Sequence, residues 1–119
     1  MKKMKILVIG DSCEDVFRYG DITRVAPEAP VPIIVPSREE SNPGMAGNVV
    51  ANLKALGADV TLITNTEIIK KIRYVDERYN QMVLRVDEND TCNRTGDTVD
   101  VSGYDVLVIS DYNKGFLKE

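Results

Sequence analysis

The run Lys5-Ile6-Leu7-Val8-Ile9-Gly10-Asp11 is the most informative stretch of the sequence. Its apolar, partly β-branched residues do not alternate with polar ones, and the run ends in glycine. This pattern is typical of a strand that is buried on both faces of a parallel sheet. Residues 60–63 (VTLI) and 105–109 (DVLVI) have the same character. The sequence therefore predicts a parallel sheet that contains all three segments.

A helix is predicted between the first two of these strands. Val49, Leu53 and Leu56 recur at helical spacing within residues 46–56, and Gly57 follows them as a C-terminal stop. The preceding dipeptide at residues 43–44 (PG) is interpreted as a turn. Strand, helix and strand in that order form a βαβ unit. We therefore expect a three-layer α/β body.

Two further regions have an extended character. Residues 19–35 contain three prolines, which exclude a helix and a central strand but allow an edge strand. Residues 73–75 and 82–86 flank a polar stretch and predict a hairpin. We expect these pieces to pair into a small sheet that stands off the main one. Residues 88–102 are polar and predict a long surface connection.

Composition narrows the functional classes. The chain has 119 residues, a net charge of −4 and 43% hydrophobic residues, which indicates one globular domain. Histidine is absent, and this excludes histidine general bases, histidine triads and almost every catalytic zinc site. An acidic balance argues against a broad face that binds nucleic-acid phosphates.

The expected compartment is the cytoplasm. The first apolar run is too short for the core of a signal peptide, and no run approaches the roughly 20 residues of a membrane span. Cys13 and Cys92 are interpreted as reduced thiols, with one disulfide between them as the alternative.

Acidic residues follow directly on the first predicted strand. Ligands of open α/β sheets bind outside the carboxyl ends of the strands, so Asp11 and Asp15 are candidates to accept hydrogen bonds from a polyol. The structural alternative is that Asp11 caps a turn while Asp15 is solvated.

Small residues at the entrance of the predicted helix form a second candidate. Gly44 and Gly47 would let a ligand approach the backbone, where free N–H groups favour anions or oxygen-rich ligands. The pattern is neither a P-loop nor a dinucleotide fingerprint. A tight turn with close helix packing is the alternative.

Basic side chains supply the remaining candidates. Lys114 follows the third strand and would meet a phosphate or remain a solvated loop lysine. Arg85, near Gln81 on the hairpin, is suited to hold a phosphate bidentately or to lie on the surface.

Taken together, these segments resemble the ribokinase-like (PfkB) carbohydrate kinases, and most of all the heptose 7-phosphate kinase domain of ADP-heptose biosynthesis. Residues 26–32 (APEAPVP) match a run specific to the heptose kinase branch. The matching motifs, in family order, are residues 9–15 (IGDSCED), 19–21 (YGD), 24–32 (RVAPEAPVP), 44–49 (GMAGNV), 52–53 (NL), 55–58 (ALGA), 71–73 (KIR), 81–87 (QMVLRVD) and 110–115 (SDYNKG).

The resemblance implies a Rossmann-like, ribokinase-like α/β body with a small β-sheet lid over the sugar site. It implies one domain over residues 1–119, with lid segments at about 19–36 and 71–87. The lids of two family subunits often pack together in a dimer. The positions that match the family's substrate contacts are Asp11, Asp15, Gly44, Asn48, Gln81 and Arg85.

Three departures from the family pattern qualify these expectations. Met45 stands where the family has the second of two glycines, and its side chain would narrow the pocket. Only residues 64–70 separate the second strand from the lid segment that begins at about residue 71. The family has a further helix–strand unit at this place. The family's Gly-Ala-Gly-Asp motif and nucleotide pocket do not occur in these 119 residues. ATP and Mg are therefore expected only in a complete family member, and no catalytic residue, cofactor site or metal site is assigned here.

The resulting expectation is an N-terminal, sugar-binding and lid-bearing portion of a sugar kinase, truncated and without catalytic competence by itself. The alternatives are a non-catalytic sugar-phosphate-binding or dimerisation module and an inactive remnant. Expected partners are a weakly bound sugar or sugar phosphate, a second copy of the chain, and a second chain that completes a kinase. Neither nucleic acid nor membrane is expected.

Overall fold

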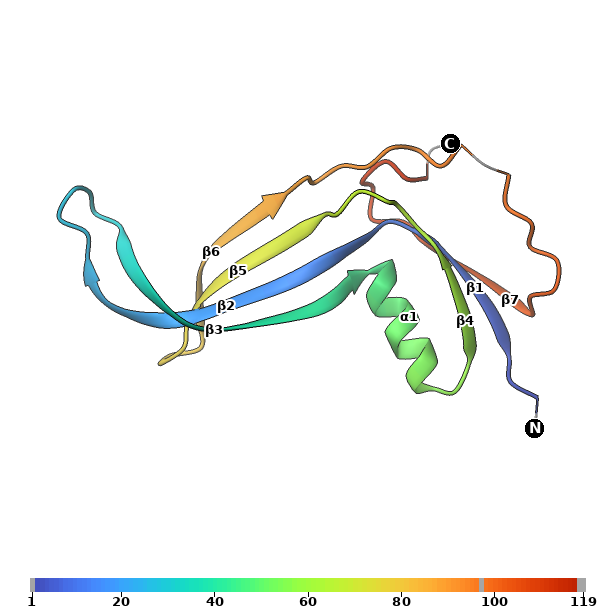
Figure 1. The fold of residues 1–119 in the computed structure, drawn as a ribbon, viewed down its shortest axis with the longest axis horizontal. Coiled ribbons are helices and arrows are strands. Elements are labelled where there is room, and N and C mark those ends of the chain that lie inside the picture. The colour runs from blue at the N-terminus through green and yellow to red at the C-terminus, as the bar shows by residue number, and fades with distance from the viewer. Residues whose placement is uncertain (1, 97, 118–119) are drawn as a thin grey trace.

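Two sheets make up the molecule (Figure 1). The computed structural model describes residues 2–96 and 98–117. A three-stranded sheet with strand order β4-β1-β7 forms the body, and a four-stranded sheet with order β3-β2-β5-β6 forms the lid. The radius of gyration is 18.5 Å, whereas a compact domain of this length has about 13.5 Å. The molecule is elongated because the lid stands off the body.

The body sheet is parallel, as predicted. Strand β1 (Lys5–Gly10) lies at its centre and pairs with β4 (Asp59–Ile63) on one side and β7 (Val106–Ser110) on the other. Residues 6–10 of the central strand are buried. This central position accounts for the unbroken apolar run, since both faces of β1 are covered.

The two faces of the body sheet are covered differently. Helix α1 (Ala46–Ala55) packs on one face, where Val50 meets Ile6 and Val8. On the other face Phe116 packs on Leu7 and Ile9, and side chains of the irregular segment before β7 pack against the same cluster. The body therefore has the expected parallel sheet, covered by a helix on one face and by irregular chain on the other. Within residues 2–96 and 98–117 the third layer contains no helix.

The lid is a mixed sheet of long strands. Strand β2 (Ser12–Val25) pairs antiparallel with β3 (Pro32–Met45) and parallel with β5 (Lys70–Asp76). Strand β6 (Gln81–Glu88) completes the predicted hairpin with β5. The sheet includes both segments expected to form the lid and extends beyond them.

The interpretation of Pro43 and Gly44 as a turn is wrong. Both residues lie in β3, where Pro43 pairs with Glu14 and Gly44 pairs with Cys13. Strand β3 is an edge strand. Proline is tolerated there because its missing N–H removes no ladder hydrogen bond when it faces away from the sheet.

The chain passes between body and lid four times. Strands β1 and β2 are separated by a single residue, Asp11, and β3 runs directly into α1. The other two passages are residues 64–69, between β4 and β5, and residues 89–105, between β6 and β7. The carboxyl end of the body sheet is therefore where the lid joins the body.

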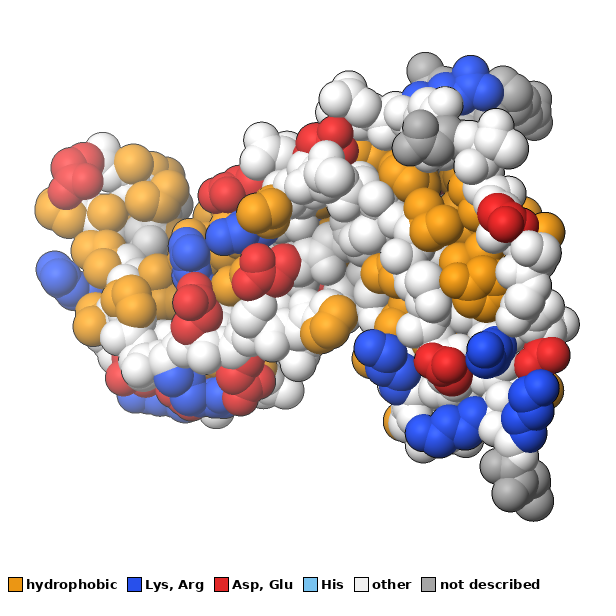
Figure 2. All heavy atoms as spheres, turned by 45° about the vertical axis from the view of Figure 1, so that its right-hand side comes forward, with side chains coloured by type: hydrophobic (Ala, Val, Ile, Leu, Met, Phe, Trp, Pro, Cys, Tyr) orange, Lys and Arg blue, Asp and Glu red, His pale blue; other side chains and the backbone are white. Residues whose placement is uncertain are grey.

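Surface properties vary along the molecule. Figure 2 shows hydrophobic side chains gathered on the body and at the far end of the lid, with charged side chains along the lid between them. Cys13 and Cys92 are both free thiols and half-buried. Among the described residues no helix has the length and apolar character that a membrane crossing requires.

Candidate functional site

Asp11 lies where β1 passes into β2, and its side chain is fully buried. One carboxylate oxygen accepts a hydrogen bond of 2.7 Å from the backbone N–H of Tyr112, and the other accepts one of 2.8 Å from the backbone N–H of Lys114. Its backbone carbonyl accepts a third, from the N–H of Ala46. Asp11 thus ties the loop after β7 and the start of α1 to the end of the central strand.

Asp15 and Gly44 face each other across β2 and β3. A Cβ added at Gly44 would lie 2.5 Å from Asp15 Oδ2 and 2.5 Å from Cys13 Sγ, so only glycine fits beside this carboxylate. Arg73 of β5 donates a hydrogen bond of 2.9 Å to Asp15 Oδ1. The side chains of Asp15 and Arg73 are 26% and 24% exposed. Asp15 is therefore fixed in place and still open to a ligand.

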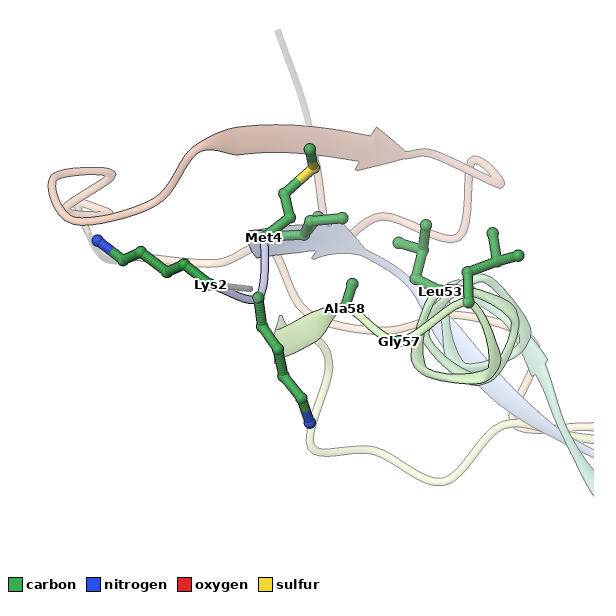
Figure 3. A pocket seen from close by; sticks show the side chains of 8 residues that line it. Lys2, Met4, Leu53, Gly57 and Ala58 are labelled. Carbon is green, nitrogen blue, oxygen red and sulfur yellow. The ribbon is translucent and has the colours of Figure 1, made fainter.

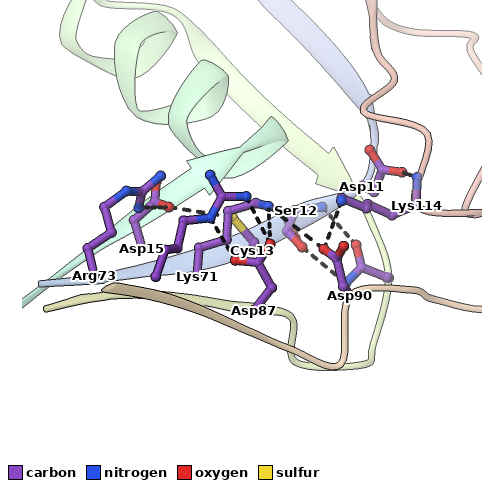
Figure 4. Close-up of polar contacts among 11 residues, drawn as sticks. Asp11, Ser12, Cys13, Asp15, Lys71, Arg73, Asp87, Asp90 and Lys114 are labelled. Atoms are coloured by element: carbon purple, nitrogen blue, oxygen red, sulfur yellow. Dashed lines mark hydrogen bonds and ion pairs between the residues drawn. The ribbon is translucent and has the colours of Figure 1, made fainter. Parts of the chain in front are cut away.

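Charged side chains continue from this pair along the lid toward the body (Figure 4). Arg85 of β6 lies opposite Arg73 in the sheet and donates two hydrogen bonds of 2.8 Å to Asp87. Lys71 of β5 lies opposite Asp87. We call Asp15, Lys71, Arg73, Arg85, Asp87, Asp90 and Lys114 the charged row.

The row ends at the body. The Lys71 ammonium lies 3.8 Å from Asp87 and 3.7 Å from Asp90. Asp90 forms an ion pair of 2.7 Å with Lys114, which follows β7. The row therefore carries alternating charge from the lid strands to the loop that Asp11 holds.

These contacts set the protonation states. Hydrogen bonds from Arg85 lower the pKa of Asp87 to about 2. The contact with Lys114 lowers the pKa of Asp90, and the same contact raises the pKa of Lys114. Burial, with Asp15 nearby, raises the pKa of the Cys13 thiol to about 11. At neutral pH Asp87, Asp90 and Lys114 are ionised, while Cys13 is a neutral thiol and a poor nucleophile.

Two of the predicted site residues lie apart from the row. Asn48 is exposed in the first turn of α1. Gln81 is exposed at the start of β6, where its side chain donates to the carbonyl of Met82. Four residues of extended strand separate Gln81 from Arg85, which is about 13 Å. Of the other predicted site residues, Asp11 lies at the lid–body junction. Asp15 and Arg85 belong to the charged row, and Gly44 lies beside Asp15.

Sequence reasoning missed Lys71, Asp87 and Asp90 as individual candidates. The signal was available in the hairpin, because Lys71 and Arg73 share one face of β5, while Arg85 and Asp87 share one face of β6. It also missed Asn65. That side-chain amide accepts from the N–H of Ser12 and donates to the carbonyls of Ser12 and Glu67, and so joins the start of β2 to the connection after β4.

A separate hollow of about 540 Å³ lies at the opposite end of the body sheet, between the start of β1 and the end of α1 (Figure 3). Its lining is mainly aliphatic, with Met4, Leu53 and Ala58 on the walls and Lys2 near the rim. It offers apolar contact and two lysines, Lys2 and Lys3, but no acidic side chain among the described residues that line it, so the charged row is the better candidate for a ligand with both hydroxyls and a phosphate.

Comparison with known proteins gives close sequence relatives. The chain is 31% identical over 150 aligned positions to the bifunctional protein HldE of Nitrosococcus oceani, covering 97% of this chain and 31% of the relative. It is 33% identical over 144 positions to the HldE of Campylobacter jejuni subsp. doylei, covering 98% of this chain and 31% of the relative. The chain is related to HldE. The predicted resemblance to ribokinase-like carbohydrate kinases of the heptose kinase branch is thereby confirmed.

The chain spans about a third of the length of the HldE relatives it matches. The first alignment has 150 positions against 119 residues here, which leaves at least 31 positions that this chain does not fill. HldE therefore holds internal residues that this chain lacks. The short passage of residues 64–69 between β4 and β5 is consistent with the helix–strand unit expected to be missing there.

Other comparisons add less. No family model matches the chain. A carbohydrate kinase from Agrobacterium tumefaciens is similar in fold, with a TM-score of 0.42 and 20% identity over 73% of this chain and 36% of that chain. A ribokinase from Cryptococcus neoformans var. grubii serotype A has a TM-score of 0.45 and 14% identity over 92% of this chain and 41% of that chain.

Proposed function

We propose that this chain is the sugar-binding and lid-bearing portion of a ribokinase-like sugar kinase, and that it binds a sugar phosphate of the heptose 7-phosphate type. In a complete protein this portion would position the sugar hydroxyl for ATP-dependent phosphorylation. The observation that carries the proposal is the charged row, which runs from Asp15 on the lid to Lys114 on the body. A ligand with hydroxyls at one end and a phosphate at the other matches that order of groups.

The hydroxyl end of the ligand belongs beside Asp15. A carboxylate accepts hydrogen bonds from hydroxyls, and such charge-assisted bonds contribute roughly 1.5–3 kcal/mol each. Gly44 has no side chain, and this lets the Asp15 carboxylate lie directly against the backbone of β3. Asp11 would act through the loop that it holds, since both of its oxygens already accept backbone N–H groups.

Phosphoryl transfer by these residues alone is not proposed. In the described part of the chain, no group of three or more His, Cys, Asp or Glu side chains is placed to hold a metal ion. Three of the four basic side chains of the row, Arg73, Arg85 and Lys114, are already closely paired with aspartates. We therefore derive no step through Mg–ATP, and we propose that the 119 residues bind a sugar phosphate without phosphorylating it.

Titration calorimetry with sedoheptulose 7-phosphate and mannose-type sugar phosphates tests the proposal. We expect binding no tighter than about millimolar, near −4 kcal/mol, because water competes for Asp15, which is 26% exposed. Asp15→Ala should abolish it. An absence of binding at tens of millimolar would reject the sugar-phosphate function, and sugar-dependent release of ADP from ATP would reject the claim of inactivity.

A second candidate function, dimerisation, rests on a separate observation. Val25, Val31 and Val35 are 64%, 49% and 57% exposed at the far end of the β2–β3 hairpin. Exposed apolar groups clustered at one end of an elongated molecule favour association. We propose a homodimer through the lid, which is compatible with sugar binding at the lid–body junction.

A further inference from the structure

Lys71 is the least satisfied member of the charged row. Its side chain is only 12% exposed. Its two carboxylate neighbours, Asp87 and Asp90, lie at 3.8 and 3.7 Å, beyond hydrogen-bond distance. This ammonium therefore lies near two carboxylates without donating a hydrogen bond to either of them. An ammonium has three donors, and a mostly buried one is stabilised by a close oxygen acceptor.

The neighbouring carboxylates cannot easily move to satisfy Lys71. Both oxygens of Asp87 accept hydrogen bonds of 2.8 Å from Arg85. The nearer oxygen of Asp90 is 2.7 Å from the ammonium of Lys114 and only 3.7 Å from that of Lys71. One carboxylate thus stands between two ammonium groups and contacts only one of them well.

The two lysines come from different halves of the molecule. Lys71 lies on β5 of the lid, and Lys114 lies in the loop that follows β7 of the body. Asp90 lies in the connection between β6 and β7, and its ion pair with Lys114 holds that connection to the body loop. Figure 4 shows Asp87 and Asp90 among these basic side chains.

We propose that Lys71 and Lys114 form a subsite for a phosphate group, and that Asp90 is a built-in competitor which occupies this subsite when no phosphate is bound. A phosphate monoester carries a charge of about −1.5 to −2 and three acceptor oxygens. It is therefore able to contact both ammonium groups at once, which the Asp90 carboxylate does not. On binding, the phosphate displaces Asp90 from Lys114 and takes over the link between lid and body.

This inference rests on the proposed sugar-phosphate function and specifies its selectivity. A free sugar has no group that competes with Asp90, so Asp90 would remain on Lys114. A phosphorylated sugar replaces Asp90 and gains the bridge between the two lysines. Displacing Asp90 from Lys114 costs free energy, and only a ligand with a phosphate offsets that cost. The subsite therefore selects phosphorylated sugars over free sugars.

Inorganic phosphate is the probe, titrated into the 119-residue chain and followed by amide chemical shifts at low salt. Lys71→Met and Lys114→Met should each weaken phosphate binding at least about tenfold, since each removes a charge-assisted contact. Asp90→Asn should tighten it about threefold or more, since the competing charge is removed while the shape is kept.

Two matched controls have the same changes in charge on the opposite face of the lid sheet. Lys70→Met lies one residue before Lys71 in β5, and Glu88→Gln lies one residue after Asp87 in β6. Both should leave the phosphate affinity within about twofold of that of the unchanged chain. Thermal unfolding of every variant establishes that the fold is retained.

Three results would overturn the inference. The first is equal weakening by Lys70→Met and Lys71→Met, which would indicate only a general charge effect. The second is unchanged or weaker binding in Asp90→Asn. The third is sugar phosphate binding that Lys71→Met does not alter, which would leave the proposed function standing. In the converse result, inorganic phosphate binds with the expected effects of the variants, but sugar phosphates bind no more tightly than inorganic phosphate. That result would reject the proposed function and support the subsite.

Discussion

The carboxylate of Asp11 accepts a hydrogen bond of 2.8 Å from the backbone N–H of Lys114, 103 residues further along the chain. The other oxygen of that carboxylate accepts from the N–H of Tyr112. The end of the first strand is thereby joined to the loop that brings Lys114 to the charged row. Asp11 has a structural role whatever it adds to ligand binding.

Replacing Asp11 should therefore cost stability. In Asp11→Asn one oxygen still accepts a backbone N–H, but the new amide group places a donor against the other. We expect a loss of about 2–4 kcal/mol in the free energy of unfolding, measured by urea denaturation. Asp111→Asn is the control, because Asp111 is exposed and accepts a hydrogen bond from the nearby backbone N–H of Asn113, so about 1 kcal/mol or less is expected. Equal small losses in both variants would contradict the assignment.

Met45 occupies a backbone conformation that favours glycine. It has φ of 55° and ψ of −126° at the start of α1, and its side chain is buried. Glycine should therefore be more stable than alanine at this position, by about 1–2 kcal/mol. At Ala51, exposed in the middle of α1, the order should be reversed, with Ala51→Gly costing about 1 kcal/mol. Chemical denaturation of Met45→Gly, Met45→Ala and Ala51→Gly measures both differences in stability. If Met45→Ala proved more stable than Met45→Gly, the backbone at this position would not be strained.

Gly44 should not tolerate a side chain. A methyl group there would overlap the Asp15 carboxylate and the Cys13 sulfur, so Gly44→Ala must displace Asp15 from Arg73. We expect a loss of about 1–3 kcal/mol in stability and the loss of sugar-phosphate binding. Gly96→Ala, which has open space around its Cβ position, should stay within about 0.5 kcal/mol of the unchanged chain. Full retention of binding in Gly44→Ala would place the sugar elsewhere.

The pair of Arg85 and Asp87 should weaken in acid. The pKa of Asp87 is about 2 in the folded chain, below its usual range, so the pair contributes stability at neutral pH. That contribution should be lost as pH falls from about 4 toward 2, when Asp87 takes up a proton. Urea denaturation across this range should show the stability difference between the unchanged chain and Asp87→Asn closing with falling pH. A difference that stays constant would mean the ion pair contributes nothing.

The chain should associate through the lid. We expect a dimer by light scattering, and a monomer after Val35→Asp, because a charge at the apolar end of the hairpin cannot be buried against a second copy. Leu56→Asp is the control, since Leu56 is 84% exposed at the end of α1 on the body and should leave the dimer intact. A monodisperse monomer of the unchanged chain at high concentration would count decisively against this association.

Much of the body was predictable from local pattern. The structure confirms the three strands predicted from their apolar runs and the helix α1 predicted from its apolar spacing. Burial on one or both faces of an element produces such patterns in its sequence. Residues 12–18 of β2 escaped prediction because polar and charged residues dominate them, whereas the rest of the strand lies in the expected lid segment at 19–36. The covering of the second face by irregular chain and Phe116 was not predicted, because that chain has no periodic pattern.

The candidate site was only partly predictable. Asp15 and Gly44 were candidates from their positions after a strand and before a helix, and again through the family resemblance. The structure places them diagonally across the β2–β3 pair. The row from Lys71 to Lys114 depends on pairing between residues that are distant in sequence, which spacing alone does not reveal. Asn48 and Gln81 remain predictions, since both are exposed away from the row.

The four passages between body and lid have a consequence for how the chain folds. The central strand β1 pairs with β7 about 100 residues away, and β2 pairs with β5 across the whole of α1 and β4. Neither sheet is built from one continuous segment, so neither can complete its strand pairing before the other begins. Chains dominated by such distant pairings fold slowly, because loop-closure entropy is lost before the contacts that reward it form. Lid and body should therefore acquire their structure in one cooperative step rather than as two independent units.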